Sequence, residues 1–296
     1  MFAAAVFRKS YYYLGAGAPE LFVRIGFKFE LIKQARIRLA PTTNLVNSLN
    51  FLLHEHGRCC DKGVPSMIKK YHHALIVGAG PGLSASLVRL FSSNGLQVTI
   101  AARTVDDLED LCLEAGATSI VCDSSNGDDV VNLFKSLEAV PPDVVVYNPS
   151  ARDRGPFIEL DPTSVKQGLM VTAYGGFLTA QEAVKRMLPN EHGAILFTGA
   201  SASVKGYAQS APFAMGKFAL RGLAQSLARE LHPKGIHIGH FVIDGGIRNR
   251  LGSEPPNRPD SMLNPDDIAK TYWSFLQQDR SIWSWEIELR PWLENF

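Results

Sequence analysis

Residues Ala74–Leu90 read ALIVGAGPGLSASLVRL, and the rest of the chain is organised around this stretch. The run Ala74–Val77 is apolar, as expected of a buried strand. Gly78, Gly80 and Gly82 come directly after it and mark a tight turn. Beyond the turn, apolar residues recur at helical spacing. The stretch therefore predicts a strand, a glycine turn and a helix in direct succession.

This succession is typical of the unit that opens a nucleotide-binding fold. A pyrophosphate must approach the backbone of the turn closely, which glycine permits because it has no Cβ. The helix after the turn directs its free N–H groups and the positive end of its dipole toward the phosphates. An ordinary turn between a strand and a helix is the alternative interpretation. The position of the glycines, between a buried strand and a helix, favours the nucleotide site.

The composition is that of an ordinary globular protein. The chain has 296 residues, of which 46% are hydrophobic and 20% charged, and its formal net charge is +1. This length suffices for one large α/β domain with an appendage, or for two small domains. The charge balance gives no indication of a nucleic-acid partner. The 4 cysteines do not make a disulfide framework, so we expect a reducing compartment. No apolar run reaches the ~18–20 residues that cross a bilayer.

Residues 1–66 differ in composition from the remainder of the chain. Up to Ala40 the chain carries seven basic residues and only two acidic ones. An Arg-rich, acid-poor and intermittently apolar segment is typical of organelle transit peptides. The alternative is a poorly ordered extension with one amphipathic helix over Leu45–Leu53, capped by Asn44. A chain start at Met67 is a third interpretation, because the nucleotide-binding strand begins shortly after it.

Within this extension, the stretch His54–Cys60 reads HEHGRCC and contains four potential metal ligands. Adjacent cysteines and a His-x-His pair do not match the usual ligand spacings of structural zinc sites. We therefore expect a polar loop here, and no metal.

From His73 onward, strand-like and helix-like runs alternate. The strand-like runs are Ala74–Val77, Gln97–Ala101, Thr118–Val121, Asp143–Tyr147, Ala194–Phe197, Ile236–Val242 and Trp283–Leu289. The helix-like runs are Gly82–Ser93, Val105–Ala115, Gly127–Leu137, Thr163–Met187, Gln209–Leu231 and Pro265–Gln278, the last capped by Asn264. Such alternation implies right-handed crossovers and a parallel sheet covered on both faces. The predicted fold class is α/β, a doubly wound parallel sheet (Rossmann fold) in three α/β/α layers over residues 67–296, with residues 1–66 as an N-terminal extension.

Three segments carry a resemblance to a known family. Gly78 and Gly82 stand at a Gly-x-x-x-Gly spacing, the tripeptide NPS that begins at Asn148 comes after the fourth strand, and HPKGI from His232 comes after a long helix. Over roughly Ala74 to Phe296 the chain resembles the short-chain dehydrogenase/reductase family. In that family the turn has a further glycine, where Ser84 stands here, and NAG comes after the fourth strand. Serine is small, so close packing of the helix on the strand should survive.

The resemblance implies a nicotinamide dinucleotide cofactor. Asp123, after the third strand, matches the acidic residue that lies near the adenine in the family. Gly245 matches the family's Pro-Gly segment beside the nicotinamide, with Asp244 in place of the proline. The expected cofactor-binding residues are Gly78, Gly80, Gly82, Leu83, Arg103, Asp123, Asn148, Lys217, Gly245 and Ile247.

The end of the second strand bears on the choice between NAD and NADP. Sites that prefer NAD place an acidic residue there, and sites that use NADP place an arginine for the 2′-phosphate. Here the strand leads into Arg103 and carries no carboxylate, and a guanidinium can meet a phosphate with its planar fork. A solvated arginine at a strand end is the alternative. We expect NADP(H) to be preferred, with NAD(H) as the second candidate.

The family's catalytic residues are only partly present. A typical member carries Asn, Ser and Tyr-x-x-x-Lys: the tyrosine transfers the substrate proton, the lysine lowers its pKa and holds the nicotinamide ribose, the serine orients the carbonyl, and the asparagine supports a relay water. Lys217 matches the lysine, but Phe213 stands in place of the tyrosine and Thr172 in place of the asparagine. The serine position falls on Ala200, and Ser201 serves only if the loop after it is one residue shorter.

Phenylalanine cannot act as a general acid or base, so the usual proton donor is missing. Three solutions remain open: Tyr207 or Ser210 reaches the site, water held by Lys217 replaces the phenol, or the protein binds nucleotide without turnover. Tyr207 lies ten residues before Lys217, the wrong helical spacing, which favours a place in the pocket wall. The candidate catalytic residues are Lys217, Ser201 and Tyr207, with Phe213 and Thr172 at the tyrosine and asparagine positions.

Two C-terminal segments have expected roles. The polar, Pro-rich segment Arg248–Leu263 is predicted to be a substrate lid. The tail Ser281–Phe296 contains three tryptophans and is too aromatic for a solvated end, so we expect it to pack on the core or on another subunit. In the family this region often lies at a subunit interface, which implies a homodimer or homotetramer.

Two functions compete. The first is an NADP(H)-dependent oxidoreductase that moves hydride between the nicotinamide and a small carbonyl or alcohol above Lys217 and Ser201. The second is a catalytically silent nucleotide-binding protein, a sensor or scaffold, which Phe213, Thr172 and Ala200 favour. Analogy at the level of the fold favours the enzyme. The expected location is cytoplasmic, or mitochondrial if residues 1–66 are a transit peptide.

Overall fold

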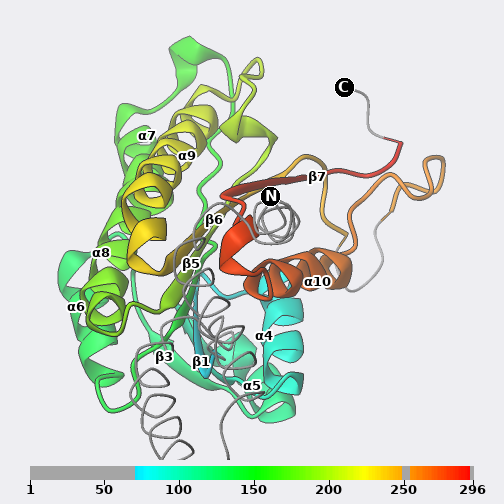
Figure 1. Ribbon diagram of the computed structural model, residues 1–296. Helices are drawn as coiled ribbons and strands as arrows, with labels where there is room; N and C mark the ends of the chain where they lie inside the picture. The colour runs from blue at the N-terminus through cyan, green and yellow to red at the C-terminus, as the bar shows by residue number, and fades with distance from the viewer. Residues whose placement is uncertain (1–70, 249–253, 294–296) are drawn as a thin grey trace, which may run out of the picture. The chain divides into compact units, whose positions relative to one another are not determined.

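A parallel sheet of 7 strands lies at the centre of the residues that the computed structural model describes, 71–248 and 254–293 (Figure 1). The strands are β1 (His73–Val77), β2 (Gln97–Ala102), β3 (Thr118–Val121), β4 (Val144–Tyr147), β5 (Gly193–Thr198), β6 (Ile236–Ile243) and β7 (Glu286–Leu289). Their order in the sheet is β3-β2-β1-β4-β5-β6-β7, and every neighbouring pair is parallel. The predicted doubly wound α/β fold is confirmed.

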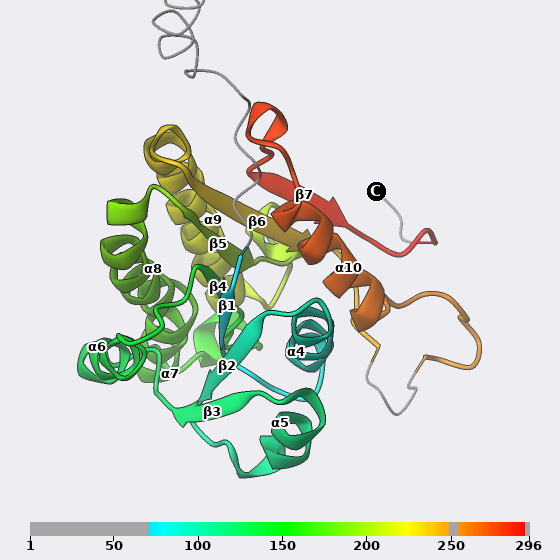
Figure 2. The same cartoon turned by 60° about the horizontal axis from the view of Figure 1, so that its bottom comes forward.

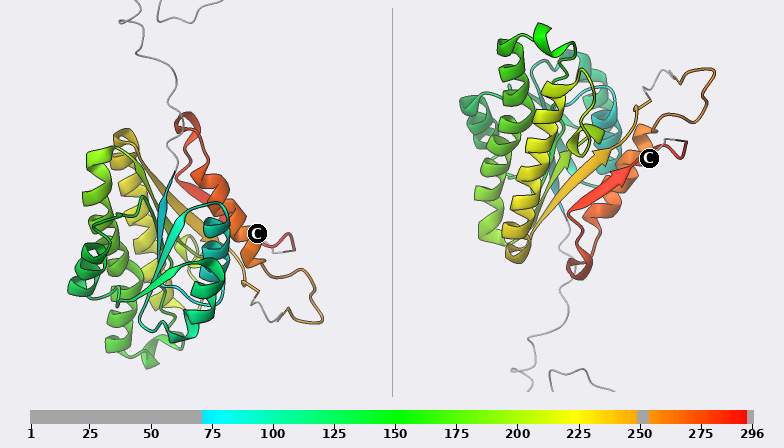
Figure 3. Two further views of the ribbon diagram at one scale, coloured as in Figure 1. Left: turned by 90° about the horizontal axis from the view of Figure 1, so that it is seen from below. Right: turned by 90° about the horizontal axis from the view of Figure 1, so that it is seen from above.

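Helices cover both faces of this sheet (Figure 2). One layer consists of α4 (Leu83–Ser93), α5 (Glu109–Ala115) and α10 (Pro265–Leu276). The other consists of α6 (Gly127–Ser136), α8 (Gly175–Met187) and α9 (Ala211–Leu231), with α7 (Pro162–Leu169) beside α9. Figure 3 shows the two layers from below and from above. Within the described part of the chain, no helix is both long enough and apolar enough to span a membrane.

The central strands β1, β4, β5 and β6 bury both faces, which explains their largely apolar runs. Successive side chains of a strand point to opposite faces of a sheet. In β1, Ala74 and Ile76 pack with α4 and α10, whereas Leu75 and Val77 pack with α6 and α8. The core is therefore divided by the sheet into two apolar clusters, one under each helical layer.

The predicted helical run over Thr163–Met187 is helical throughout, but it is not a single α-helix. A π-helical turn over Met170–Tyr174 separates α7 from α8. The Tyr147 hydroxyl, at the end of β4, donates a hydrogen bond to the carbonyl oxygen of Val171 at 2.5 Å. That carbonyl would otherwise accept from the N–H four residues later, so the side chain interrupts the α-helical ladder.

Two predictions about the C-terminal part are confirmed. Asn264 caps α10, with its side chain accepting a hydrogen bond from the N–H of Asp266 at 3.0 Å. In the tail, Trp283 stacks on His237 of β6 with ring centroids 4.3 Å apart, so this part of the tail packs on the core. Trp292, by contrast, is 80% exposed.

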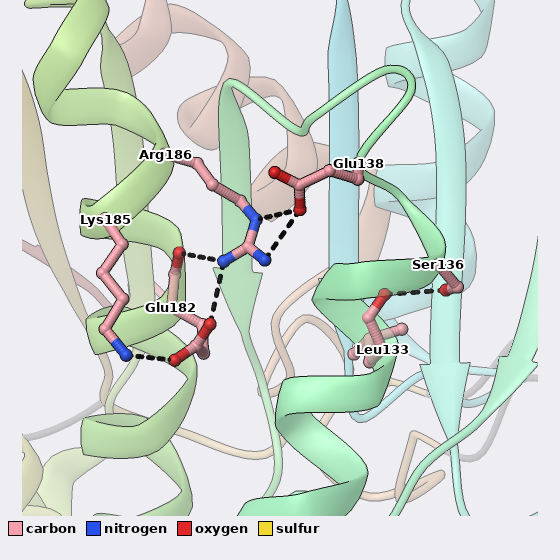
Figure 4. Close-up of polar contacts among 6 residues, drawn as sticks. All are labelled: Leu133, Ser136, Glu138, Glu182, Lys185 and Arg186. Atoms are coloured by element: carbon pink, nitrogen blue, oxygen red, sulfur yellow. Dashed lines mark hydrogen bonds and ion pairs between the residues drawn. The ribbon is translucent and has the colours of Figure 1, made fainter.

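An ion-pair network ties α8 to the segment after α6 (Figure 4). The Arg186 guanidinium donates to Glu182 Oε2 at 2.8 Å and to Glu138 Oε2 at 2.9 Å, and Lys185 also pairs with Glu182. Each of these charges has a partner of opposite sign on the same face of the sheet. We assign the network a structural role in the packing of α6 and α8.

The predicted helix over Leu45–Leu53 and the stretch His54–Cys60 lie outside the described residues.

Candidate functional site

The glycine turn lies at the point where the strand order reverses. β1 and β4 are neighbours in the sheet, and the chain after β1 runs toward β2 while the chain after β4 runs toward β5. In open α/β sheets, ligands bind at this switch point, outside the carboxyl ends of the strands. The sheet thus brings together the residues directly after β1 and β4, which include Gly78 and Asn148.

Gly78 is required by the geometry of the turn. Its φ is +79°, and a Cβ built there would lie 2.6 Å from the ring of Pro149. Around Gly80 and Gly82 the situation is the opposite, because a Cβ at either position would meet no atom within 4 Å. The turn therefore has open space above Gly80 and Gly82, where a phosphate group can approach the backbone.

A hydrogen-bond chain fixes this turn to the end of β4. Asn148 donates from Nδ2 to Ser84 Oγ at 2.8 Å, and Ser84 Oγ donates to the carbonyl oxygen of Gly78 at 3.2 Å. Ser84 stands in the place of the family's glycine and is 1% exposed. Its hydroxyl joins α4 to the glycine turn and to the end of β4 by hydrogen bonds. Leu83 is buried in the core, which leaves only its backbone N–H for a ligand.

The first turn of α4 suits an anion. Gly82 is the N-cap, and the first turn carries no acidic side chain. The free N–H groups and the positive end of the helix dipole favour a phosphate at such a terminus. The open glycines and this helix start together fit the pyrophosphate of a dinucleotide.

Arg103 and Asp123 meet at the carboxyl ends of β2 and β3. Arg103 is exposed. The pKa of the Asp123 carboxyl lies below its usual value, chiefly because Ser125 Oγ donates a hydrogen bond to it, and the positive charge of Arg103 lowers it further. Since β2 and β3 are adjacent, both side chains lie at the edge of the sheet where the adenosine half of the cofactor is expected.

Lys217 is buried one turn inside α9. Its side chain is 2% exposed, and Nζ donates a hydrogen bond to the carbonyl oxygen of Thr198, at the end of β5, at 2.7 Å. Burial, and after it the positive charge of Arg152, lower the pKa of Lys217 to about 7. A lysine in this state exchanges its proton near neutral pH.

Phe213 lies one turn before Lys217, on the same side of α9. It is buried in a small apolar cluster with Ala200 and Ala202. The guanidinium carbon of Arg152 lies over its ring, 5.0 Å from the centroid. The place where the family has a phenol and a serine hydroxyl is thus lined by carbon atoms and approached by a cation.

The remaining candidate residues differ in how they approach this centre. Thr172 is buried in the π-helical turn, and its Oγ1 accepts a hydrogen bond from the N–H of Ala151 at 3.1 Å. Ser201 begins the 3₁₀ turn Ser201–Ser203 and is half-buried. Tyr207 is 48% exposed in the segment before α9.

The segment after β6 is held by ion pairs. Asp244, in the place of the family's proline, is 4% exposed and accepts from Lys205 Nζ at 2.8 Å and from Arg290 at 3.2 Å. Ile247 pairs with Leu263 in an isolated bridge. Gly245 lies in the chain between Asp244 and Ile247, and it lies beside Pro291.

Sequence reasoning missed two residues near this centre, Arg152 and His240. No sequence signal pointed to Arg152, because its role depends on contacts with the ring of Phe213 in α9. His240 is buried in β6, where its Nδ1 donates to Glu286 Oε2 at 3.0 Å. Burial lowers its pKa to about 4, so it is neutral near pH 7. A histidine inside an apolar strand run gives no sequence signal.

Comparison with known proteins agrees with this geometry. A family model described as short chain dehydrogenase matches residues 72–249, more than half of the chain. The chain is 31% identical over 176 residues to a (21S)-21-acetoxyl-apo-melianone synthase SDR from Melia azedarach, covering 56% of this chain and 63% of that protein. It is 32% identical over 190 residues to the cyclic-di-GMP-binding biofilm dispersal mediator protein of Escherichia coli (strain K12), covering 62% and 76%. The match thus spans a little under two thirds of the Melia protein.

Solved structures agree as well. A short-chain dehydrogenase from Rhodopseudomonas palustris superposes with a TM-score of 0.66 at 31% identity, covering 75% of this chain and 100% of that one. A metagenomic short-chain oxidoreductase in complex with NADP has a TM-score of 0.65 at 24% identity, covering 75% and 98%, and shows likeness of fold. The glycine turn, the strand order and these matches lead to one conclusion: the chain belongs to the short chain dehydrogenase family.

Proposed function

We propose that the protein is an oxidoreductase that uses NADP(H) and acts on a small carbonyl or alcohol substrate. One observation carries the proposal. Lys217 is buried, its pKa is lowered to about 7, and it lies at the same edge of the sheet as the open glycine turn. A protein that only bound nucleotide would have no need of an ammonium group that can change its protonation near pH 7. Perturbed lysines of this kind are typical of proton-transfer sites.

Several residues would hold the cofactor. Gly78–Gly82 and the start of α4 offer the pyrophosphate a cradle, and Lys217 is placed to meet the nicotinamide ribose, as the family resemblance implies. Arg103 supports the preference for NADP(H), because a guanidinium fork suits the 2′-phosphate, while NAD(H) is the second candidate. When bound, the cofactor supplies or accepts the hydride.

The proton needs another source, because Phe213 carries none. We propose that Lys217 itself, directly or through one water, gives a proton to the substrate oxygen during reduction and takes it back during oxidation. Its pKa of about 7, set by burial and by Arg152, is near the optimum for such a role. Ser201, half-buried at the start of its 3₁₀ turn, is the candidate for orienting the carbonyl, and Tyr207 for the pocket wall.

A second candidate function also has support. Ala200, Ala202 and Phe213 close together into an apolar cluster where polar catalytic groups are expected, which suits a nucleotide-binding sensor or scaffold without turnover. One relative, the Escherichia coli dispersal mediator, is named for binding a nucleotide and not for a reaction. The buried Lys217 argues for the enzyme over this alternative.

We further propose that the chain forms a homodimer or homotetramer. Large apolar side chains are exposed on the π-helical turn, α8 and α9, namely Tyr174, Phe177, Met215 and Phe218, each between 41% and 50% exposed. Exposed apolar side chains in such number suit contact with a second copy. Residues 1–66 remain a proposed extension, and a cytoplasmic or mitochondrial location remains a prediction.

Nucleotide titration and turnover assays together test the proposed function. NADPH and NADH are titrated by calorimetry, and NADPH oxidation is measured over a panel of ketones, aldehydes and quinones. We expect NADPH to bind and at least one carbonyl to be reduced, with activity lost in Lys217→Ala. Nucleotide binding without any turnover would favour the silent protein, and absence of binding would refute both.

A further inference from the structure

Arg152 is a charged side chain near Lys217 to which the proposed reaction assigns no contact with the substrate or the cofactor. It comes only a few residues after β4 and is exposed. Its guanidinium lies over the face of Phe213, 5.0 Å from the ring centroid, and its charge acts on Lys217. A guanidinium on an aromatic face is attracted by the ring quadrupole, which holds its plane in place.

The backbone around Arg152 is fixed on both sides. The N–H of Ala151 donates to Thr172 Oγ1 at 3.1 Å, and the N–H of Gly155 donates to the carbonyl oxygen of Gln209 at 3.1 Å. Two of the chain's departures from its family thus act on one loop: Thr172 anchors the residue before Arg152, and Phe213 supports its guanidinium. A loop tethered in this way presents a charge at a defined place.

The charge balance at this place favours an anion. Asp244, the buried carboxylate of the neighbouring segment after β6, is already shared by Lys205 and Arg290. Among residues 71–248 and 254–293, no carboxylate forms an ion pair with Arg152. Arg152 is therefore an exposed cation close enough to Lys217 to lower its pKa, and no carboxylate of the described residues neutralises it.

We propose that Arg152 is a substrate-binding residue that selects carbonyl compounds bearing a carboxylate, that is, oxo acids and the matching hydroxy acids. The proposal rests on the proposed oxidoreductase function. The planar fork of arginine matches the two oxygens of a carboxylate and forms two parallel hydrogen bonds. Such a contact would hold the substrate carbonyl toward Lys217.

Matched pairs of substrates test this assignment. Pyruvate, acetoacetate and levulinate, each beside its methyl ester, are assayed with NADPH, and the same acids are titrated by calorimetry into the NADPH-loaded full chain. The variants are Arg152→Gln, which removes the charge, and Arg152→Lys, which keeps the charge without the fork. Arg154→Gln, exposed in the same loop, is the matched control.

We expect at least one acid to bind and to be reduced faster than its ester. Arg152→Gln should lower the ratio of kcat/KM for that acid to kcat/KM for its ester by about 10- to 100-fold, the effect of losing a charge-assisted contact. The ratio is the readout because loss of the Arg152 charge also raises the pKa of Lys217, which changes the turnover of both substrates alike. Arg152→Lys should fall between the two, and Arg154→Gln should match the wild type. Calorimetry should show the same loss of acid binding in Arg152→Gln.

Failure of the assignment and failure of the proposed function give different results. Acids that bind through Arg152 without turnover would uphold the assignment and count against the oxidoreductase. Equal use of acid and ester, no acid binding to the loaded protein, or an equal fall of kcat for both substrates in Arg152→Gln would overturn it. The last outcome would mean that Arg152 acts through Lys217 or on the carbonyl oxygen, and not on a carboxylate.

Discussion

The side-chain amide of Asn148 donates a hydrogen bond to Ser84 Oγ at 2.8 Å and so joins the end of β4 to the first turn of α4. Ser84 in turn donates to the carbonyl oxygen of Gly78. Asn148 and Ser84 both lie beside the turn that is proposed to hold the pyrophosphate. Ser84 departs from the family pattern, and its partner explains it: the hydroxyl accepts a hydrogen bond from Asn148, the residue of the family's NAG tripeptide that this chain keeps.

Ser84→Ala should lower the stability of the protein and weaken nucleotide binding together. Removal of the hydroxyl breaks its two hydrogen bonds and leaves the half-buried Asn148 amide and Gly78 carbonyl only their direct contact at 3.4 Å, a loss of about 1–3 kcal/mol. For a domain of this size the melting temperature should fall by several °C, since ~1 kcal/mol corresponds to about 2–4 °C. Calorimetry measures it, with Ser93→Ala, a serine at the exposed end of α4, as the control. Equal melting temperatures for the two variants would show that the link contributes nothing.

Arg103→Ala should weaken NADPH binding much more than NADH binding. A lost contact to the 2′-phosphate is worth about 1.5–3 kcal/mol, whereas NADH has no phosphate to lose. Titration calorimetry with both nucleotides measures the difference. Arg89→Ala is the control, because Arg89 is paired with Glu114 on α4 and α5. Equal losses for both nucleotides, or none, would remove Arg103 from the site.

The fold was predictable because the central strands β1, β4, β5 and β6 bury both of their faces. Runs such as Ala74–Val77 and Val144–Tyr147 are continuously apolar, which is typical of parallel sheets between two helical layers. The interruption at Met170–Tyr174 was not predictable, because its cause is the Tyr147 hydroxyl, a residue distant in sequence that takes the Val171 carbonyl. Periodicity records which face of a helix is apolar and carries no information about such a tertiary hydrogen bond.

The candidate site, like the fold, could be predicted from the sequence only in part. The glycine turn and Lys217 stand at fixed spacings in the chain and were found from the sequence. Arg152 was not, because its significance comes from the ring of Phe213 beneath its guanidinium and from the anchor of Ala151 on Thr172. Those contacts join β4, α9 and the π-helical turn, and only the folded chain brings them together.

A chain that begins at Met67 should fold and bind nucleotide as the full chain does. Met67–Phe296 is one compact unit, and β1 begins a few residues after its start. Thermal melting and NADPH titration of both chains measure the effect. A shortened chain that melts far below the full one would show that residues 1–66 contribute to the core.

The stability of the protein should rise with pH above neutrality because of Lys217. Burial, and after it the Arg152 charge, lower its pKa from the ordinary 10.5 to about 7, so between these values the unfolded state binds the proton and the folded state does not. Stability then increases by up to about 1.4 kcal/mol per pH unit in that window. Urea unfolding of wild type and Lys217→Met across the window isolates the contribution of Lys217, because all other groups cancel. Parallel stability curves would show that Lys217 stays charged when folded.

Phe213→Tyr should restore a proton donor at the position where the family has one. Phe213 lies one turn before Lys217 on the same side of α9, and the change adds a single oxygen. The guanidinium of Arg152, which lies over the ring at this position, favours a phenolate, so it should lower the pKa of the new phenol. If proton transfer limits turnover, the variant should be faster than the wild type by up to ~10²–10⁴-fold.

The pH profile separates this gain from a mere change of packing. In the wild type, reduction should fall as pH rises through about 7, because Lys217 loses the proton that it is proposed to supply. In Phe213→Tyr the descending limb should move to the pKa of the phenol, while Phe213→Leu, which adds no hydroxyl, should keep the wild-type limb. NADPH oxidation by the three proteins over one pH series gives the comparison. A faster variant with an unmoved limb would mean that the ring only repacks the site, and no turnover in any of them, with nucleotide still bound, would leave the silent nucleotide-binding protein as the better account.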